Sequence, residues 1–163
     1  MATPSRRQEI LTAFLDRVSA ITVENHYATD VGRRVFFGEG VELGEDDPPT
    51  ALAIVVQDSQ PQPRGGFLEV PVLVEFQALA KVDPDLVDQP YIAAEIILTD
   101  VQRAIEAGDR TLGGRIKGEL QLGPTRVVPK QPGSMAVGVG VAYGGTFIRT
   151  WGQPLSSCGW TGR

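Results

Sequence analysis

At 163 residues the chain has the length of one domain that can bury a core, and its 42% hydrophobic and 21% charged residues are ordinary for a soluble globular protein. The net charge of −5 speaks against a protein that binds nucleic acid by neutralising phosphates, because that mechanism needs a basic surface. The single cysteine, Cys158, excludes an intrachain disulfide framework and a cysteine-rich zinc site.

The N-terminal segment predicts an amphipathic helix over residues 6–18. Apolar side chains recur there at three- and four-residue spacing, and either Ser5 or Thr3, ahead of Pro4, is suited to cap its start. Residues 20–33 contain several turn formers and are expected to be irregular, and residues 35–37 predict a short strand.

An acidic segment, residues 38–50, follows this strand. It combines three glycines and two prolines with five carboxylates, those of Glu39, Glu42, Glu45, Asp46 and Asp47. This composition is typical of a mobile, solvated loop. Beyond it, residues 51–57 predict a compact apolar strand, and residues 58–66 predict a long hairpin connection.

Residues 67–79 predict a long strand with one buried face, because apolar and polar side chains alternate along them. Pro71 lies within this run and has no backbone N–H to donate. We therefore expect either an edge strand or a bulge at that residue.

A second amphipathic helix of about five turns is predicted over residues 89–107. Asp88 is suited to cap its start and Pro90 to its first turn, while Gly108 is suited to the left-handed position just past its end. One apolar stripe runs along the helix, so it is expected to lie on the sheet that the neighbouring strands form.

The C-terminal third predicts two more strands, over residues 115–129 and 135–143. Gly138 and Gly140 lie on one face of the second strand, where they leave room for a helix or another subunit. Residues 144–163 show neither a helical nor a strand period.

Together these elements predict an α+β fold, a mostly antiparallel four-stranded sheet covered on one face by two helices. Strands 51–57 and 67–79 form one expected hairpin, and strands 115–129 and 135–143 the other. We expect residues 1–149 to make a single domain and residues 150–163 to make a tail that becomes ordered on a partner.

Few residues indicate catalysis. His26 is the only histidine and is interpreted as a loop residue, so neither a Ser-His-Asp nor a Cys-His arrangement is indicated. The acidic segment lacks the alternating Asp/Asn pattern of a calcium loop. We expect a protein that is not an enzyme and that holds no metal or cofactor.

Two groups of residues are candidates for contact with another subunit or a partner. Asp109, Arg110 and Thr111 form either a capping turn after the second helix or part of an interface. Trp151 and Trp160 either close the end of the core or serve as docking anchors in a Gly/Pro-rich tail.

Six short motifs carry a resemblance to a known family. They are Arg-Gln-Glu-Ile-Leu-x-Ala-Phe-Leu (7–15), Val-Phe-x-Gly (35–38), Ala-Leu-Ala-Ile-Val-Val (51–56), Asp-Val-Gln-Arg-Ala-Ile-Glu (100–106), Asp-Arg-Thr-Leu-Gly-Gly (109–114) and Val-Ala-Tyr (141–143). In this order the chain resembles the tail terminator (tail completion) proteins of long-tailed bacteriophages and related prophages. The match covers residues 6–145, and the helix with its Asp-Arg-Thr-Leu-Gly-Gly loop is the most specific part.

The resemblance implies a structural virion protein. Such a protein is made in the host cytoplasm, assembles as a hexameric ring on the tail tube, stops tube growth and forms the surface that joins tail to head. Its partners would be further copies of itself, the tail tube protein, a head–tail connector or neck protein, and DNA that passes the channel without specific binding. No membrane contact is expected, because no apolar run is long enough to span a bilayer. Glu45, Asp46 and Asp47 are hypothesised to face the channel and repel DNA.

Other interpretations stay open. A neck or head-completion protein, or a minor tail protein, would have the same composition. A small α+β enzyme or ligand-binding domain would need paired acids, such as Glu69 or Glu75 with Asp100, although these residues are expected on solvent faces. An immunity or toxin-binding partner is indicated by acidity alone.

Overall fold

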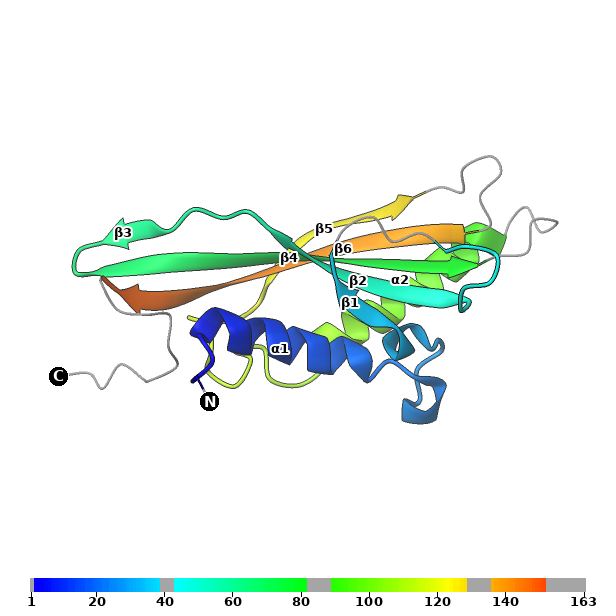
Figure 1. Cartoon of the computed structure of the whole chain (residues 1–163), viewed down its shortest axis with the longest axis horizontal. Coiled ribbons are helices and arrows are strands. Elements are labelled where there is room, and N and C mark those ends of the chain that lie inside the picture. Colours follow the sequence, from blue (N-terminus) through cyan, green and yellow to red (C-terminus); the bar gives the residue numbers. More distant parts are fainter. Residues whose placement is uncertain (1, 39–42, 82–88, 129–135, 152–163) are drawn as a thin grey trace.

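The computed structural model describes residues 2–38, 43–81, 89–128 and 136–151 (Figure 1). Its elements are the helices α1 (Arg6–Ser19) and α2 (Gln89–Glu106), the 3₁₀ turns η1 (Val23–Asn25) and η2 (Val31–Arg33), and the strands β1 (Val35–Phe37), β2 (Thr50–Gln57), β3 (Gln62–Arg64), β4 (Phe67–Lys81), β5 (Gln121–Val128) and β6 (Ala136–Thr150).

The strands form one sheet in the order β1-β2-β4-β6-β5, and β3 pairs with the beginning of β4. The predicted α+β class is confirmed, and so are the β2–β4 and β5–β6 hairpins. The predicted number of four strands is wrong, because the sheet of the described residues has six; it is mostly antiparallel, as predicted, although β1 pairs with β2 in parallel. The strand missed was β3, a Gln-Pro-Arg segment without apolar alternation inside the expected hairpin connection.

The longest feature is an antiparallel ribbon of β4 and β6. Its register runs without a break from Phe67 opposite Thr150 to Lys81 opposite Ala136. Fifteen residues of strand extend about 50 Å. The prediction ended β6 at Tyr143, because Gly144 and Gly145 interrupt the apolar alternation, but the strand continues to Thr150.

Pro71 does not mark an edge strand, because β4 lies inside the sheet between β6 on one side and β2 and β3 on the other. The register of β3 ends at Glu69, and that of β2 begins at Leu73. The Pro71 carbonyl accepts a hydrogen bond of 2.6 Å from the Ser59 hydroxyl, so the backbone of Pro71 faces this gap. The sheet therefore requires no N–H at Pro71, which explains how a proline fits an inner strand.

The core lies between the sheet and the two helices, which both lie on one face (Figure 1). Phe14 of α1 packs edge-on against Phe76 of β4 at 5.5 Å between ring centroids, and Phe76 packs against Tyr143 of β6 at 6.0 Å. The Tyr143 hydroxyl donates a 2.8 Å hydrogen bond to Glu106 of α2. One aromatic column therefore joins both helices to the middle of the sheet.

The helix ends agree with the predicted signals where the structure describes them. The Ser5 hydroxyl accepts from Gln8 N–H at 3.1 Å, and the Gln8 side chain accepts from Ser5 N–H at 2.7 Å, which makes a capping box. Gly108 has φ +92° just past α2, as predicted. The predicted cap Asp88 lies outside the described residues.

Gly138 and Gly140 of β6 lie on the outer face of the sheet, which points away from the helices. Within the subunit, side chains of neighbouring strands rather than a helix lie beside them. A Cβ at Gly138 would lie 2.9 Å from Leu79, and one at Gly140 would lie 2.9 Å from Arg126 and 3.1 Å from Glu75. The ion pair between Glu75 and Arg126 crosses the strand at Gly140.

The predicted strand 115–129 begins only at Gln121. Before it, the chain forms turns in which Gly114 and Gly118 have positive φ angles of 75° and 73°. The Ile116 side chain packs on Gly145, and Lys117 N–H donates to the Thr146 carbonyl at 2.6 Å. This segment therefore lies along β6 without forming a regular ladder.

Candidate functional site

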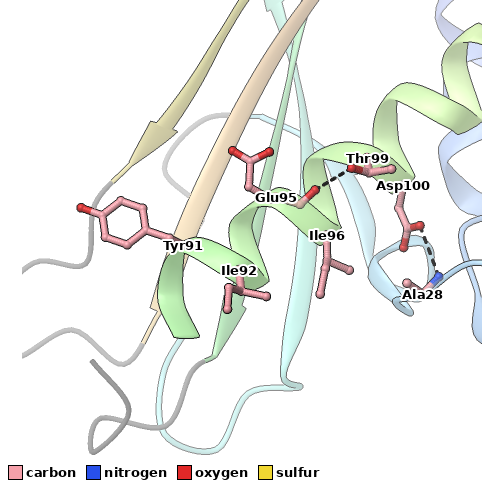
Figure 2. Close-up of a pocket in the computed structure, with 7 residues that line it drawn as sticks. All are labelled: Ala28, Tyr91, Ile92, Glu95, Ile96, Thr99 and Asp100. Carbon is pink, nitrogen blue, oxygen red and sulfur yellow. Dashed lines mark hydrogen bonds between the residues drawn. The ribbon is translucent and has the colours of Figure 1, made fainter. Parts of the chain in front are cut away.

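An apolar groove lies along the first turns of α2 (Figure 2). Tyr91 is 63% exposed and Ile92 is 59% exposed, and Ile96 lies one turn further along the helix. The groove has a volume of about 430 Å³ and is lined by Ala28, Tyr91, Ile92, Glu95, Ile96, Thr99 and Asp100. Exposed apolar side chains gathered in a hollow are typical of a surface that binds a partner.

Sequence reasoning missed this groove, although a signal was present. The predicted apolar stripe contained Ala94, Ile97, Leu98, Val101, Ala104 and Ile105, and these are the apolar residues that α2 buries. Ile92 and Ile96 are four residues apart and lie off that stripe, so they form a second apolar strip on the same helix. Large apolar residues outside the buried stripe are the pattern that indicates it.

A second exposed apolar surface lies at the other end of the molecule, at the end of the β4–β6 ribbon (Figure 1). We call it the ribbon tip and define it as Phe67, Ile148 and Trp151, all of which are exposed. Trp151 directly follows the last residue of β6. The other predicted anchor, Trp160, lies outside the described residues.

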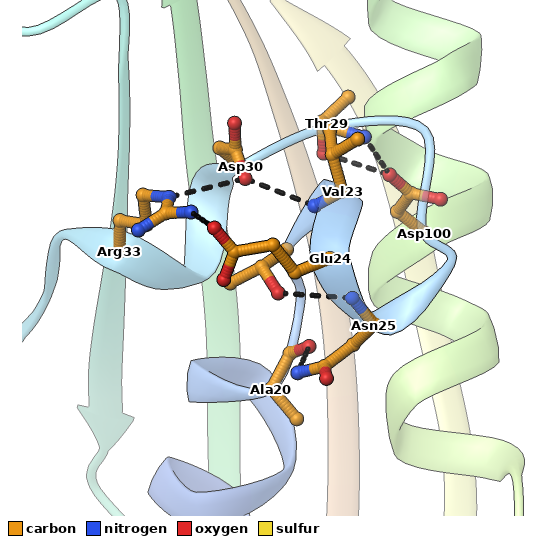
Figure 3. A network of polar contacts seen from close by, with 9 residues as sticks. Ala20, Val23, Glu24, Asn25, Thr29, Asp30, Arg33 and Asp100 are labelled. Atoms are coloured by element: carbon orange, nitrogen blue, oxygen red, sulfur yellow. Dashed lines mark hydrogen bonds and ion pairs between the residues drawn. The ribbon is translucent and has the colours of Figure 1, made fainter.

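Asp100 is the buried carboxylate beside the α2 groove (Figure 3). It accepts hydrogen bonds from Ala28 N–H at 3.2 Å, from Thr29 N–H at 2.8 Å and from the Thr29 hydroxyl at 2.7 Å. The expectation that Asp100 faces solvent was wrong, because the chain after α1 folds over it. The side chain attaches that segment to α2.

The same segment, residues 20–34, is held by a polar network (Figure 3). Arg33 pairs with Glu24 at 2.7 Å and with Asp30 at 3.2 Å. Asp30 also accepts from Val23 N–H at 2.9 Å, and this hydrogen bond, with the Arg33 charge, lowers the pKa of Asp30. His26 is exposed at φ 66° after η1, which confirms its interpretation as a loop residue.

The carboxylates that an enzyme would need do not converge. Glu69 and Glu75 lie on the outer face of the sheet, where the Lys117 ammonium is 2.7 Å from Glu69 and Arg126 pairs with Glu75. The hydrogen bond from Lys117 lowers the pKa of Glu69. Asp100 belongs to the helix layer on the opposite face, so neither glutamate shares a pocket with it.

The predicted interface residues after α2 form a structured turn. The Asp109 carboxylate accepts from the Thr111 hydroxyl at 2.6 Å, from Thr111 N–H at 2.8 Å and from Gly113 N–H at 2.9 Å. These bonds, with the nearby Arg17 charge, hold the pKa of Asp109 below its ordinary value. Arg110 stays exposed, 3.9 Å from Glu119, and contact of these three residues with another subunit remains a prediction.

The acidic residues predicted to face a channel differ in their surroundings. Asp47 accepts from Gly44 N–H at 2.7 Å and lies 3.6 Å from Arg34, so its carboxylate holds a turn. The Lys81 ammonium donates to the carbonyls of Glu45 and Asp47. The side chains of Glu45 and Asp46 are exposed, whereas Glu39 and Glu42 lie outside the described residues.

No protein-family model matches the chain, and no curated protein is significantly similar to it in sequence. Within residues 2–38, 43–81, 89–128 and 136–151, no three His, Cys, Asp or Glu side chains gather to hold a metal ion. In this part of the chain there is also no helix long and apolar enough to cross a membrane.

Proposed function

We propose that the chain is a structural virion protein, the tail terminator of a long-tailed phage or prophage. In this proposal, six copies form a ring on the head-proximal end of the tail tube, stop its elongation and provide the surface that joins the tail to the head. The resemblance in the order of motifs supports the proposal. Genomic DNA would pass through the ring without specific binding, in agreement with the net charge of −5.

The observation that carries the proposal is the presence of two different exposed apolar surfaces on one chain, the α2 groove and the ribbon tip. They lie at opposite ends of the molecule (Figure 1). A closed ring of identical subunits needs two different surfaces on each copy, because every copy binds one neighbour on each side. A catalytic role is less well supported, since the acidic candidates Glu69, Glu75 and Asp100 are divided between two faces of the sheet.

The test uses tail tubes assembled from the tube protein encoded by the same phage or prophage. The purified chain is added during tube growth, and the tubes are imaged by electron microscopy. We expect a ring at one end of each tube, with a mass about six times the 17.5 kDa of the chain, and a halt in elongation.

Tubes that keep growing and carry no cap would contradict the proposal. Binding to DNA-filled heads without binding to tubes would point instead to a neck or head-completion protein. An unrelated acidic protein of similar mass serves as the control for non-specific charge effects.

A further inference from the structure

Two residues of the ribbon tip, Phe67 and Ile148, lie on one face of the ribbon. Because Phe67 pairs with Thr150 and Glu69 pairs with Ile148, Phe67 and Ile148 are diagonal neighbours on the same face of the ribbon. Trp151 is 55% exposed and Ile148 is 48% exposed. An aromatic side chain of this kind can bury about 150–250 Å² in a contact, so the tip has the character of a docking anchor.

The α2 groove has the complementary shape. It is a hollow lined by Ile92 and Ile96 and flanked by the Tyr91 ring (Figure 2). Its volume of about 430 Å³ leaves space for an aromatic side chain from outside.

The charges beside the two surfaces are opposite. Glu95 is exposed at the groove, and within the described part of the chain its carboxylate has no ion-pair partner. At the tip, Arg64 of β3 lies opposite Phe67 and is 3.5 Å from Glu69. Arg64 also lies 3.5 Å from the Gln62 side-chain oxygen, and Glu69 has a closer partner in Lys117 at 2.7 Å. Because both contacts of Arg64 are long and its side chain is exposed, its guanidinium is available for another carboxylate.

We propose that the ribbon tip of one copy docks into the α2 groove of the next copy, with Trp151 as the apolar anchor and Arg64 facing Glu95. This inference rests on the proposed ring and identifies the interface that closes it. Pairing of like surfaces is disfavoured, because groove-to-groove contact brings two Glu95 carboxylates together and tip-to-tip contact brings two Arg64 guanidinium groups together. A head-to-tail contact between opposite ends of an elongated chain closes into a ring when its rotation permits.

The test is thiol cross-linking with a short bismaleimide in a Cys158→Ser background. One protein carries Ile148→Cys at the tip, and a second, with a tag that changes its mass, carries Ile92→Cys in the groove. A third, with Ala107→Cys at an exposed residue outside both surfaces, is the control. Each protein is treated alone and in a 1:1 mixture, both in solution and on tail tubes.

We expect tip–groove heterodimers in the mixture and almost none in the single proteins or with the control. A chain that carries both Ile148→Cys and Ile92→Cys should give a ladder that ends at six copies. Tip–tip or groove–groove dimers in the single proteins would overturn the inference, and so would a lack of heterodimers on tubes that are visibly capped. Capped tubes without heterodimers would leave the proposed function standing and refute the interface. Cross-linked rings that never cap a tube would refute the function and support the interface.

Charge reversal gives a second measurement. Arg64→Glu and Glu95→Arg should each weaken self-association at least about fivefold, and the two together should restore most of it. Trp151→Ala should weaken it at least about tenfold, which is the effect typical of an aromatic anchor. All three residues are exposed, and circular dichroism verifies that the variants fold. If the double charge reversal weakened self-association as much as the single reversals do, the result would contradict the Arg64–Glu95 contact.

Discussion

Asp100 is a residue whose carboxylate joins two parts of the chain that are far apart in sequence. It accepts three hydrogen bonds from Ala28 and Thr29, and it is only 4% exposed. Removing the acceptor leaves donors without partners in a mostly buried place, which costs more than an exposed hydrogen bond.

We therefore expect Asp100→Ala to lower the free energy of unfolding by about 1–3 kcal/mol, measured by urea denaturation. Thr99→Ala is the matched control, because Thr99 is the preceding residue of α2, is exposed, and within the described residues its hydroxyl donates to the Glu95 carbonyl alone. The control should change stability by less than about 0.5 kcal/mol. Equal effects of the two substitutions would show that Asp100 does not hold the segment.

Tyr143 gives the fold a pH dependence on the alkaline side. Burial, and after it the hydrogen bond to Glu106, raises the pKa of Tyr143 above its ordinary value. The phenol of the unfolded chain loses its proton near pH about 10, whereas the folded state keeps it protonated. The stability that the protonated Tyr143 hydroxyl contributes is therefore complete below pH about 10 and is lost as the pH rises further.

The unfolding free energy of the unmodified chain should therefore fall above pH 10 more steeply than that of Tyr143→Phe, measured by denaturant unfolding between pH 7 and 11. At pH 7 the substitution should cost about 0.5–1.5 kcal/mol, the usual value of one hydrogen bond. Parallel pH profiles for the two proteins would contradict the role of this hydroxyl.

The gap between β2 and β3 is the element-scale feature that makes Pro71 acceptable. Pro71→Ala should cost no more than about 1 kcal/mol, which reflects the lost rigidity of the unfolded chain. Val72→Pro should cost clearly more, because the next residue directs its N–H toward β6 and takes part in the ladder. Thermal unfolding of the two variants gives the comparison, and similar losses would mean that the gap does not matter.

The helices and strands were largely predictable where apolar residues recur at one clear spacing, helical or alternating. Residues 6–18, 51–57 and 67–79 gave clear patterns, and α1, β2 and β4 follow them closely. The pairing of β4 with β6 was not predictable in the same way, because it joins two hairpins that are separated by α2. The end of β6 could not be predicted, because Gly144 and Gly145 interrupt the apolar alternation. The structure accounts for these glycines, since the Leu73 and Ile116 side chains pack against them.

The candidate site was less predictable than the fold. Trp151 was interpreted as either a core residue or an anchor and is exposed at the ribbon tip, whereas the groove on α2 was missed although Ile92 and Ile96 lie outside the buried stripe. Asp109 and Thr111 were candidates for an interface, yet their side chains bond within one turn. Sequence alone could not distinguish a capping turn from an interface at these residues, because both use the same polar residue types.

On the scale of the whole molecule, the acidic segment can now be divided into a structural and an exposed part. If Glu45 and Asp46 face the channel of the proposed ring, the double substitution Glu45→Gln and Asp46→Asn should slow DNA ejection, because two repelling charges per copy are removed. Phages that carry the double substitution are compared with the parent in an ejection assay at several salt concentrations.

Asp47→Asn provides the contrast, since Asp47 pairs with Arg34 and holds the turn at Gly44. It should affect stability more than ejection. Unchanged ejection kinetics in the double variant would refute the channel hypothesis without affecting the proposed ring.

The interrupted ladder at residues 70–72 has a consequence for how many copies a ring contains. A ring of six turns each copy by about 60° relative to the next, and this angle depends on the direction in which the ribbon leaves the body of the subunit. At residues 70–72 β4 has a strand partner on the β6 side alone, and two-stranded ribbons twist and bend more readily than wider sheets. The size of the proposed ring would then depend on the curvature of a backbone segment that lies outside both proposed docking surfaces, so changes there would alter the number of copies.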